Sequence, residues 1–313
     1  MQSKLGKFHK VAVLKGGPSS ERAISLKSGA AVAEGLRGAG YEVIEVDVQR
    51  PALELTEPVD GVFIALHGEF GEDGQVQSLL EARGIPYTGS GPVACRASFD
   101  KRLSKSVFIR EGIPTARYEV LGPNSPLTLP LPVVVKPPCQ GSTIGIFKIS
   151  KPGDWEPAFR ESLRYDGEVI AESFIPGREL TVGVIGEMAL PIIEILAPDG
   201  WYDFDAKYSQ GHSQHLCPAP LDKVLADRAR DIALRVFKAL GCRGLGRVDF
   251  RLTEQGELFV LELNNIPGFT ETSLLPEAAR SEGIGFSELC RQIMEMATLD
   301  ASQPHPGEKS YVV

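Results

Sequence analysis

With 313 residues, 42% of them hydrophobic, the chain can bury substantial cores, and its length predicts two or three domains. Its formal net charge of -8 at pH 7 argues against nucleic acid or an acidic membrane face as the main partner. The five cysteines form no CxxC pair, which argues against a disulfide framework or a zinc site and favours reduced thiols. Because the first apolar run, residues 11–14, is far too short for a signal or membrane-spanning segment, we expect a soluble, cytoplasmic protein.

The N-terminal part of the chain alternates short apolar strands with helix-length connections. Residues 11–14, 41–46 and 61–66 are typical of strands, and residues 24–36 carry helical periodicity. This rhythm predicts an α/β fold with a small doubly wound parallel sheet. The glycine turn after the first strand does not fit GxGxxG, so a tight β-α turn explains it as well as a phosphate-binding loop does.

Two polar residues stand out in this part. Glu21, at the start of the first helix, could cap that helix through its macrodipole or hold an amine, and on this residue alone the cap is the better interpretation. His67 follows the third strand, where open α/β sheets place ligand loops. Residues 87–92 then break the pattern before a helix predicted over 98–112, which we take as the domain boundary.

The central block contains a second candidate site. Two strand-like stretches, 132–137 and 144–149, are joined by a glycine-serine-threonine loop. Such a loop offers backbone N–H groups and hydroxyls to a phosphate, and Lys136 would supply charge. The loop lacks the Walker pattern, and a plain hairpin with a flexible tip stays open as the alternative.

Residues 168–182 read as a strand, an interrupted linker and another strand. A hinge of this kind can hold a planar base, with Glu172 and backbone groups at its edge and Glu179 at a ribose hydroxyl. A simple domain crossover is the alternative. Residues 201–218 form a long polar and aromatic stretch that is typical of a lid, in which we interpret His212 and His215 as solvent-facing.

Helices are predicted at 226–240 and 286–299, and the tail 301–313 is expected to be disordered. Between these helices, two alternating runs, 246–252 and 257–264, predict a β-hairpin. With a loop of even length, the register gathers polar residues on one face and the apolar side chains of Phe259, Leu261 and Leu263 on the other. The polar set is Arg247, Asp249, Glu262 and Asn264.

Two carboxylates and an amide oxygen on one surface are hard ligands that suit Mg²⁺. Arg247 could neutralise the carboxylates instead, and for the hairpin alone a solvated face with a salt bridge is the better interpretation. The hairpin leaves through Pro267 and Gly268, a turn at which the backbone can approach a ligand closely.

Taken together, the chain resembles the D-alanine–D-alanine ligases of the ATP-grasp superfamily. The matching segments occur in the family's order and span almost the whole chain: 16–22, 65–68, 71–74, 87–91, 100–101, 135–137, 141–142, 206–208, 217–219, 246–249 and 262–273. The resemblance implies a three-domain ATP-grasp architecture, with domains at 1–97, 98–178 and 179–300 and ATP between the last two. It also implies joining of two D-alanines through an acyl phosphate for peptidoglycan precursor synthesis, and a homodimer.

The same resemblance assigns roles to individual residues. The implied ATP contacts are Lys101, Lys136, Glu172, Phe174, Ile175, Glu179 and Lys207. The implied ligands of two Mg²⁺ ions, which Mn²⁺ could replace, are Asp249, Glu262 and Asn264. The implied substrate and catalytic groups are Glu21, His67, Ser142, Tyr208, Arg247, Gly268 and Ser273.

The sequence departs from the family pattern at Cys139-Gln140, where many relatives have an acidic residue, and at Asn265-Ile266, where a Thr is common. Neither departure removes an implied ligand. Two rival functions stay open. One is an ATP-grasp enzyme that joins other amino or hydroxy acids, and the other is a nucleotide-binding regulatory protein without catalysis.

Overall fold

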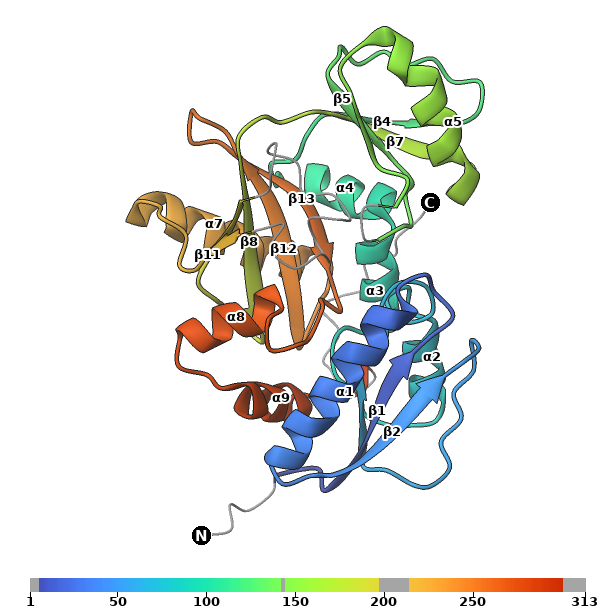
Figure 1. Ribbon diagram of the computed structural model, residues 1–313, viewed down its shortest axis with the longest axis vertical. Coiled ribbons are helices and arrows are strands. Elements are labelled where there is room, and N and C mark those ends of the chain that lie inside the picture. The colour runs from blue at the N-terminus through green and yellow to red at the C-terminus, as the bar shows by residue number, and fades with distance from the viewer. Residues whose placement is uncertain (1–5, 142–143, 197–213, 301–313) are drawn as a thin grey trace.

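The computed structural model describes residues 6–141, 144–196 and 214–300. Three sheets organise these residues, and each forms a separate lobe with its own helices (Figure 1). The N-terminal lobe is a parallel sheet, whereas the central and C-terminal lobes are antiparallel. The α/β fold class predicted from the sequence is therefore confirmed, including the N-terminal parallel sheet.

The N-terminal sheet has the strand order β2-β1-β3. Its central strand β1 (Lys10–Gly16) is almost entirely buried, because helices cover parallel sheets on both faces. The other elements are β2 (Glu42–Val48), β3 (Gly61–Ile64), α1 (Arg22–Gly38) and α2 (Gln75–Ala82). The carboxyl end of β1 points toward the other two lobes (Figure 1), and β3 runs parallel to β1.

The single helix predicted over 98–112 is wrong at its start. The structure has two helices, α3 (Pro92–Phe99) and α4 (Lys101–Arg110). They are separated because Asp100 adopts an extended conformation and its carboxylate caps α4 by accepting from the Arg102 N–H at 2.9 Å. Lys101 is consequently the first residue of α4.

The central lobe is an antiparallel sheet with the order β4-β7-β5-β6. Its strands are β4 (Tyr118–Leu121), β5 (Val133–Lys136), β6 (Phe147–Ile149) and β7 (Val169–Ser173). The 3-10 turn η1 (Pro152–Asp154) and helix α5 (Trp155–Asp166) cover one face of this sheet (Figure 1). Apolar side chains of α5 close a core with this sheet, so this lobe packs as a separate unit.

The C-terminal sheet has the main path β11-β10-β8-β12-β13. Its strands are β8 (Arg178–Ile185), β9 (Met188–Ala189), β10 (Ile193–Leu196), β11 (Gln214–Leu216), β12 (Leu245–Leu252) and β13 (Leu258–Asn264). Its helices are α7 (Lys223–Ala239), α8 (Leu274–Ser281) and α9 (Phe286–Glu295). The Val107 and Phe108 side chains of α4 join the core beneath β8, β12 and α7. The boundary at 97/98 stays a prediction.

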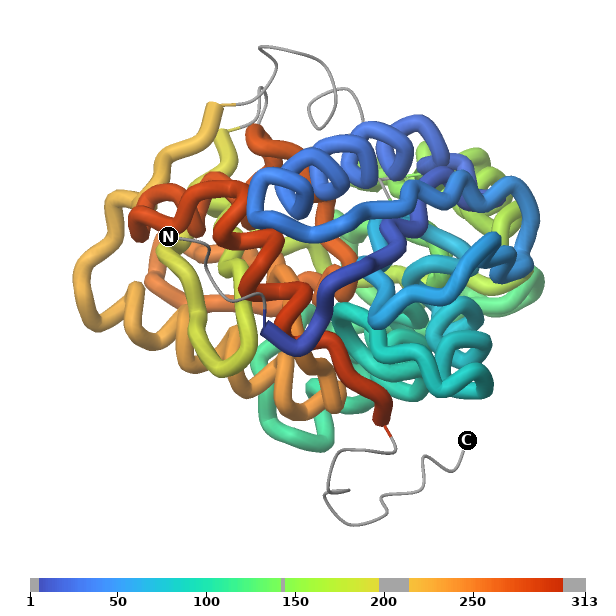
Figure 2. Tube along the Cα trace, turned by 90° about the horizontal axis from the view of Figure 1, so that it is seen from below, coloured from blue at the N-terminus to red at the C-terminus, as the bar shows by residue number. Residues whose placement is uncertain are grey.

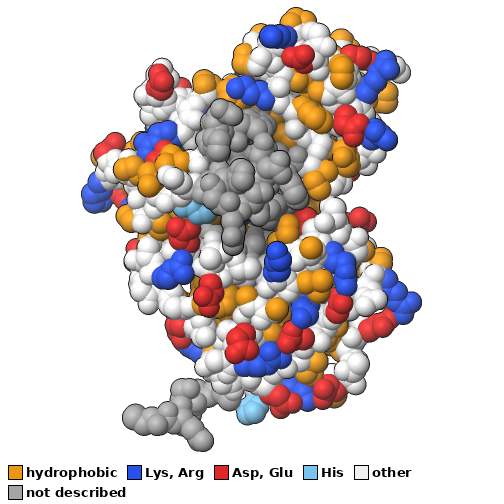
Figure 3. Space-filling view, viewed as in Figure 1, with side chains coloured by type: hydrophobic (Ala, Val, Ile, Leu, Met, Phe, Trp, Pro, Cys, Tyr) orange, Lys and Arg blue, Asp and Glu red, His pale blue; other side chains and the backbone are white. Residues whose placement is uncertain are grey.

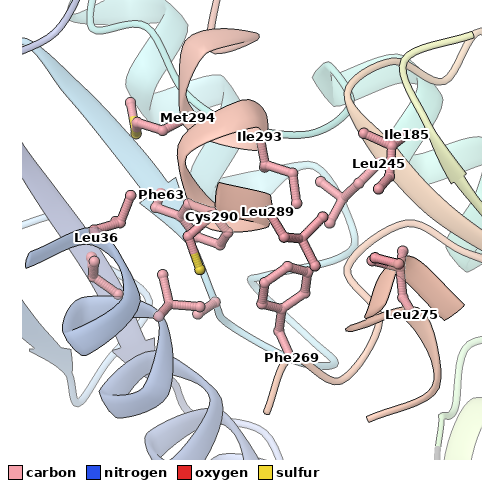
Figure 4. Close-up of a cluster of buried hydrophobic side chains, with 14 of the residues drawn as sticks. Leu36, Phe63, Ile185, Leu245, Phe269, Leu275, Leu289, Cys290, Ile293 and Met294 are labelled. Atoms are coloured by element: carbon pink, nitrogen blue, oxygen red, sulfur yellow. The ribbon is translucent and has the colours of Figure 1, made fainter. Parts of the chain in front are cut away.

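The end of the chain returns to the N-terminal lobe. In Figure 4, Ile293, Met294 and Cys290 of α9 lie beside Leu36 of α1 and Phe63 of β3. The same core contains apolar residues of the C-terminal sheet, and α9 lies close to α1 in the view of Figure 2. The first and third lobes therefore share one buried core, which fixes the loop around Phe269 against the N-terminal sheet.

Candidate active site

The candidate site lies where the three sheets meet, and the β12–β13 hairpin forms its floor. Asp249 lies opposite Glu262 and Arg247 lies opposite Asn264 in the antiparallel register. All four side chains therefore share one face, as the sequence predicted. Because like charges directly opposite each other repel, this pair of carboxylates needs cations or hydrogen-bond donors beside it.

The route to that register differs from the prediction. The loop between the strands has an odd length, residues 253–257, and a β-bulge next to Asp249 and Phe250 restores the alignment. The bulge turns Leu261 into the cavity lining, while Leu263 stays in the core. The expectation that Phe259, Leu261 and Leu263 share one apolar face is thus wrong for this hairpin, because the extra residue shifts the alternation.

Asp249 accepts hydrogen bonds from three neighbouring side chains. Arg247 binds it in a bidentate manner, with Nε and Nη2 at 2.9 and 2.8 Å from the two carboxylate oxygens. The buried Thr181 of β8 donates its hydroxyl at 2.6 Å, and Asn264 donates its amide at 2.9 Å. The salt bridge considered as the alternative to a metal site therefore exists in this structure.

Glu262 has a different cation. Lys101 Nζ lies 3.3 Å from Glu262 Oε2 and donates to the backbone carbonyl of Gln140 at 2.8 Å. Burial opposes the charged form, but Glu262 outweighs it and raises the pKa of Lys101. Gln140, which the sequence marks as a departure from the family pattern, thus contributes a carbonyl that any residue could supply.

A cavity of about 110 Å³ lies between β5 and β7 of the central sheet and β8, β12 and β13 of the C-terminal sheet. Apolar side chains form much of its wall, and charged groups converge at one end, as is typical of a small-molecule site. Its lining residues include Lys136, Glu172, Phe174, Ile175, Glu179, Asp249, Arg251, Leu261 and Glu262. The structure therefore brings the residues expected at the base and the ribose to one cavity together with Lys136, whereas Lys101 lines a neighbouring pocket with Gln140 and Glu262.

Glu172 lies between two lysines within the protein. Its Oε1 is 2.6 Å from Lys136 Nζ and 3.2 Å from Lys105 Nζ, and its side chain is buried. Burial alone would raise the pKa of Glu172, but the two lysines outweigh that effect and lower it. Glu172 is therefore a carboxylate, an acceptor for an N–H donor in the cavity.

The linker after β7 is held by Arg251. This guanidinium donates to the carbonyls of Ile175 and Gly177 at 3.1 and 2.8 Å and to Glu179 Oε2 at 3.1 Å. The backbone N–H of Phe174 donates to the Pro132 carbonyl at 3.0 Å. A base edge would therefore have to use other backbone groups here than the Phe174 N–H and the Ile175 carbonyl.

Glu21 lies where the N-terminal lobe meets the glycine loop of the central lobe. A β-carbon at Gly68 would come within 2.8 Å of Glu21 Oε2, and one at Gly141 would come within 2.9 Å. Both positions therefore need glycine for this close approach, and Gly68 also has a φ of 71°. The carboxylate thus faces the site rather than only capping α1, for which it makes no side-chain cap bond.

His67 is buried behind this corner. Its Nδ1 donates to the Ile266 carbonyl at 3.0 Å, and its Nε2 lies 3.0 Å from Ser28 Oγ. Burial opposes protonation, but the hydrogen bond to Glu72 and the nearby acidic charges raise the pKa of His67. His67 therefore links the N-terminal sheet to the loop that follows β13.

That loop brings Gly268 and Ser273 together. A β-carbon at Gly268 would lie 3.5 Å from Ser273 Oγ. Ser273 precedes α8, and its hydroxyl accepts from the Thr270 N–H at 2.9 Å. Phe269 packs on Phe63 with ring centroids 5.7 Å apart, which anchors the loop in the shared core.

Ser142, Lys207 and Tyr208 lie outside the described residues, as do most of the expected lid and the tail 301–313. His212 lies outside them as well. His215 is not solvent-facing as expected, because its Nδ1 is 2.8 Å from Glu277 Oε2 of α8 and its side chain is 21% exposed.

Comparison with known proteins agrees with this geometry. Residues 106–295 match the D-ala D-ala ligase C-terminus and residues 48–90 match the D-ala D-ala ligase N-terminus. A D-alanine–D-alanine ligase of Methylacidiphilum infernorum is 45% identical over 289 residues, which cover 92% of this chain and 95% of that protein. One of Geotalea uraniireducens is 44% identical over 304 residues, which cover 95% and 98%.

The chain belongs to the D-alanine–D-alanine ligase family. A solved structure of this family from Bacillus anthracis has a TM-score of 0.81 at 32% identity and covers 92% of this chain and 97% of its own. A second structure of that enzyme, complexed with ATP, has a TM-score of 0.79 at 30% identity. The resemblance inferred from the sequence is thereby confirmed.

Sequence reasoning about this ligase-family site missed Lys105, Thr181 and Arg251. Lys105 could have been found from its spacing, because it lies four residues after Lys101 on a helix and so on the same face. Thr181 gave no signal, since its role depends on its pairing with Asp249 across β8 and β12. Arg251 alternates with Arg247 and Asp249 along β12 and therefore belongs to the same face.

Proposed function

We propose that this protein joins two molecules of D-alanine into D-alanyl-D-alanine and converts ATP to ADP and phosphate. The observation that carries the proposal is the convergence of three features: the Asp249–Glu262–Asn264 face, the cavity containing Lys136 and Glu172, and the Glu21 carboxylate at Gly141. Membership of the D-alanine–D-alanine ligase family supports the choice of substrate.

The chemistry requires activation of a carboxylate, which is a poor electrophile. ATP would phosphorylate the first D-alanine to an acyl phosphate, and the amine of the second D-alanine would displace phosphate through a tetrahedral intermediate. Lys101 and Lys136 would neutralise charge on the transferred phosphoryl group. We assign the γ-phosphate contact to Lys207, the adenine contacts to Glu172 and the Phe174–Ile175 backbone, and the ribose contact to Glu179.

The substrate roles follow from position. Glu21 would hold the ammonium of the first D-alanine, with Ser142 and Tyr208 linked to it and His67 supporting that corner. Arg247 and the Gly268 backbone would stabilise the oxyanion, an interaction worth about 3 kcal/mol in other enzymes. Ser273 would bind the carboxylate of the second D-alanine.

Two Mg²⁺ ions, or Mn²⁺ in their place, fit the donor set of Asp249, Glu262 and Asn264. All three offer hard oxygen atoms, and Asn264 uses its amide nitrogen toward Asp249, so its oxygen is the atom suited to a cation. Among the residues that the structure describes, His, Cys, Asp and Glu form no metal-binding group of three or more. The proposed site differs from such a group because its third ligand is an amide, and the ions would screen phosphate charge.

The surroundings agree with small-molecule substrates. Over the described part of the face in Figure 3, acidic and basic side chains are interspersed rather than gathered into one basic patch. None of the described helices is long and apolar enough to cross a membrane. We further propose a cytoplasmic homodimer that supplies peptidoglycan synthesis and contacts neither nucleic acid nor membrane, with the domain boundaries at 97/98 and 178/179.

The test is phosphate release from ATP in the presence of D-alanine, L-alanine or neither. We expect release that depends on D-alanine, together with a dipeptide detected by mass. Phosphate release independent of D-alanine, or product from other amino acids only, would favour another ATP-grasp activity. Nucleotide binding without any turnover would favour a regulatory protein.

A further inference from the structure

Lys105 is a fully buried lysine behind the cavity wall. Its side chain is 0% exposed, and its Nζ lies 3.2 Å from Glu172 Oε1 and 2.7 Å from Thr115 Oγ1. It is absent from the residues that line the cavity, whereas Glu172 and Lys136 both line it. Lys105 therefore reaches the cavity through Glu172.

A buried lysine is expensive to keep charged. Burial lowers the pKa of Lys105 to about 8, although the charge of Glu172 opposes this change. Such a residue is rarely retained for packing alone, since an apolar side chain of similar length would fill the same space without desolvating a charge. Its position beside Glu172 suggests a role in what Glu172 binds.

The contacts of Glu172 Oε1 show what that role is. Both Lys136 and Lys105 lie within ion-pair distance of this one oxygen. When Lys136 turns toward a phosphate, a buried carboxylate whose charge depended on Lys136 alone would be left uncompensated, at a large cost. Lys105 would still lie beside Glu172 in that state and would compensate its charge.

We propose that Lys105 is a positioning residue for ATP, which keeps Glu172 ionised as an acceptor for the adenine amino group and frees Lys136 for the phosphates. This inference rests on the proposed function, because it assumes a nucleotide in the cavity. An ionised Glu172 accepts a hydrogen bond from the 6-amino group of adenine and repels the 6-oxo group of guanine. Lys105 therefore also supports selection of ATP over GTP.

Thr115 fixes the position of Lys105 relative to the β12–β13 hairpin. The Thr115 hydroxyl accepts from Lys105 Nζ and donates to the Val260 carbonyl of β13 at 2.8 Å. Val260 in turn donates its backbone N–H to the Pro114 carbonyl at 2.8 Å. The Lys105 ammonium is thus held at a set distance from the strand that carries Glu262.

The experiment measures ADP and GDP binding by calorimetry, and the KM for ATP and for D-alanine, for the native protein and Lys105→Met. We expect ADP affinity to fall about tenfold or more, with a smaller ADP-over-GDP preference. The KM for D-alanine should stay within about twofold of the native value. Lys15→Met, which removes a lysine paired with Glu45 in the N-terminal sheet, is the matched control.

A double-mutant cycle with Glu172→Gln decides whether Lys105 acts through Glu172. In that background Lys105→Met should change ADP affinity by less than about twofold, because the carboxylate it serves is gone. An equal loss in both backgrounds, or a loss of thermal stability with unchanged nucleotide affinity, overturns the inference and leaves Lys105 structural.

If Lys105→Met does not fold, Thr115→Val removes the hydroxyl that holds Lys105 while keeping the shape of the site. We then expect about a threefold loss of ADP affinity in the same direction, and no change overturns the inference. If the native protein binds neither ADP nor ATP, the proposed function is contradicted. If the native protein and the Lys105 variant bind ADP equally tightly, only the inference about Lys105 is contradicted.

Discussion

Three carboxylates of the candidate site have basic side chains beside them, and the four cations come from β12, α4 and β5. Arg247 of β12 binds Asp249, Lys101 of α4 lies beside Glu262, and Lys105 and Lys136 flank Glu172. Since these groups are at least partly buried, a substitution that keeps the shape but removes one charge leaves a partner without compensation. Isosteric variants are therefore the informative ones.

Glu262→Gln is the first such variant. It keeps the side-chain shape but removes one of two carboxylates from the proposed Mg²⁺ site and the ion pair to Lys101. We expect turnover to fall by at least about a hundredfold while the fold is retained. Phosphate release over a range of Mg²⁺ concentrations and circular dichroism test this. Glu257→Gln in the exposed hairpin loop is the control, and near-native turnover of Glu262→Gln at limiting Mg²⁺ would mean that the hairpin is structural.

The pH dependence of nucleotide binding is the second prediction. The pKa of Lys105 is lowered to about 8, so the charged form prevails below that pH and is lost above it. The groups facing it are Glu172 of β7, Lys136 of β5, the Tyr118 ring of β4 at 5.5 Å, and the more distant charge of Glu262. ADP affinity should be flat up to about pH 8 and then fall by up to tenfold per pH unit.

Calorimetry with ADP between pH 7 and 9.5 measures this decrease of affinity. The Lys105→Met variant should bind ADP weakly over this whole pH range and show no decrease of affinity near pH 8, because no proton is lost at that position. A decrease of equal size in the variant would assign the titration to another group.

At the scale of elements, the β12–β13 hairpin shows which features can be predicted from sequence alternation and which cannot. Alternation along β12 and β13 placed Arg247, Asp249, Glu262 and Asn264 on one face, because side-chain direction follows directly from strand geometry. Alternation could not reveal the bulge, since an odd loop with a bulge and an even loop without one give the same pairing of Asp249 with Glu262. Phe259 was misplaced for that reason.

The contacts between elements were harder to predict than the elements. The Lys105–Glu172 pair joins α4 to β7, and the Thr181–Asp249 pair joins β8 to β12. Neither pair has a periodic signature, because its two members are distant in the sequence and meet only through the topology. The family resemblance supplied residue roles, but it carried no information on these supporting contacts.

Thr181→Val tests one of them. Thr181 is 1% exposed, and its hydroxyl donates to Asp249 Oδ1 at 2.6 Å, so valine keeps the shape and removes the donor. Because Arg247 and Asn264 still hold Asp249, we expect kcat to fall only about tenfold, in line with one hydrogen bond to a charged group. Steady-state kinetics measures this, with Thr128→Val on the exposed surface as the control. An unchanged kcat would show that Arg247 and Asn264 orient Asp249 without Thr181.

At the scale of the whole molecule, the lobes are not equally independent. The N-terminal lobe and the C-terminal sheet share one hydrophobic core through α9, whereas the central lobe closes a core of its own. A lobe with a separate core can move as a rigid body relative to its neighbours at little cost in buried apolar area. Opening of the nucleotide cavity is therefore best assigned to the central lobe, with Glu21 and Ser273 kept together on the other side.

The last prediction concerns Asn265, which joins that larger unit. Its side chain is 2% exposed and its Nδ2 donates to the Glu72 carbonyl at 2.9 Å, to Ser98 Oγ at 2.7 Å and to the Cys95 carbonyl at 3.3 Å. Asn265 therefore connects the end of β13, which carries Glu262 and Asn264, to the N-terminal lobe and α3. Asn265→Ala leaves buried acceptors without donors, so the unfolding free energy should fall by about 1–3 kcal/mol.

Urea unfolding measures that loss, and Asn124→Ala at an exposed loop is the matched control, expected to change stability by no more than about 0.5 kcal/mol. Asn265→Ala should also raise the KM for D-alanine by a larger factor than it changes the Kd for ADP. The reason is that the lost hydrogen bonds join the lobe that carries Glu21 to the lobe that carries Ser273. The proposed nucleotide cavity lies between the central and C-terminal sheets, and Asn265 is not among its lining residues. Equal loss of ADP affinity and D-alanine affinity would show instead that the three lobes respond as one body.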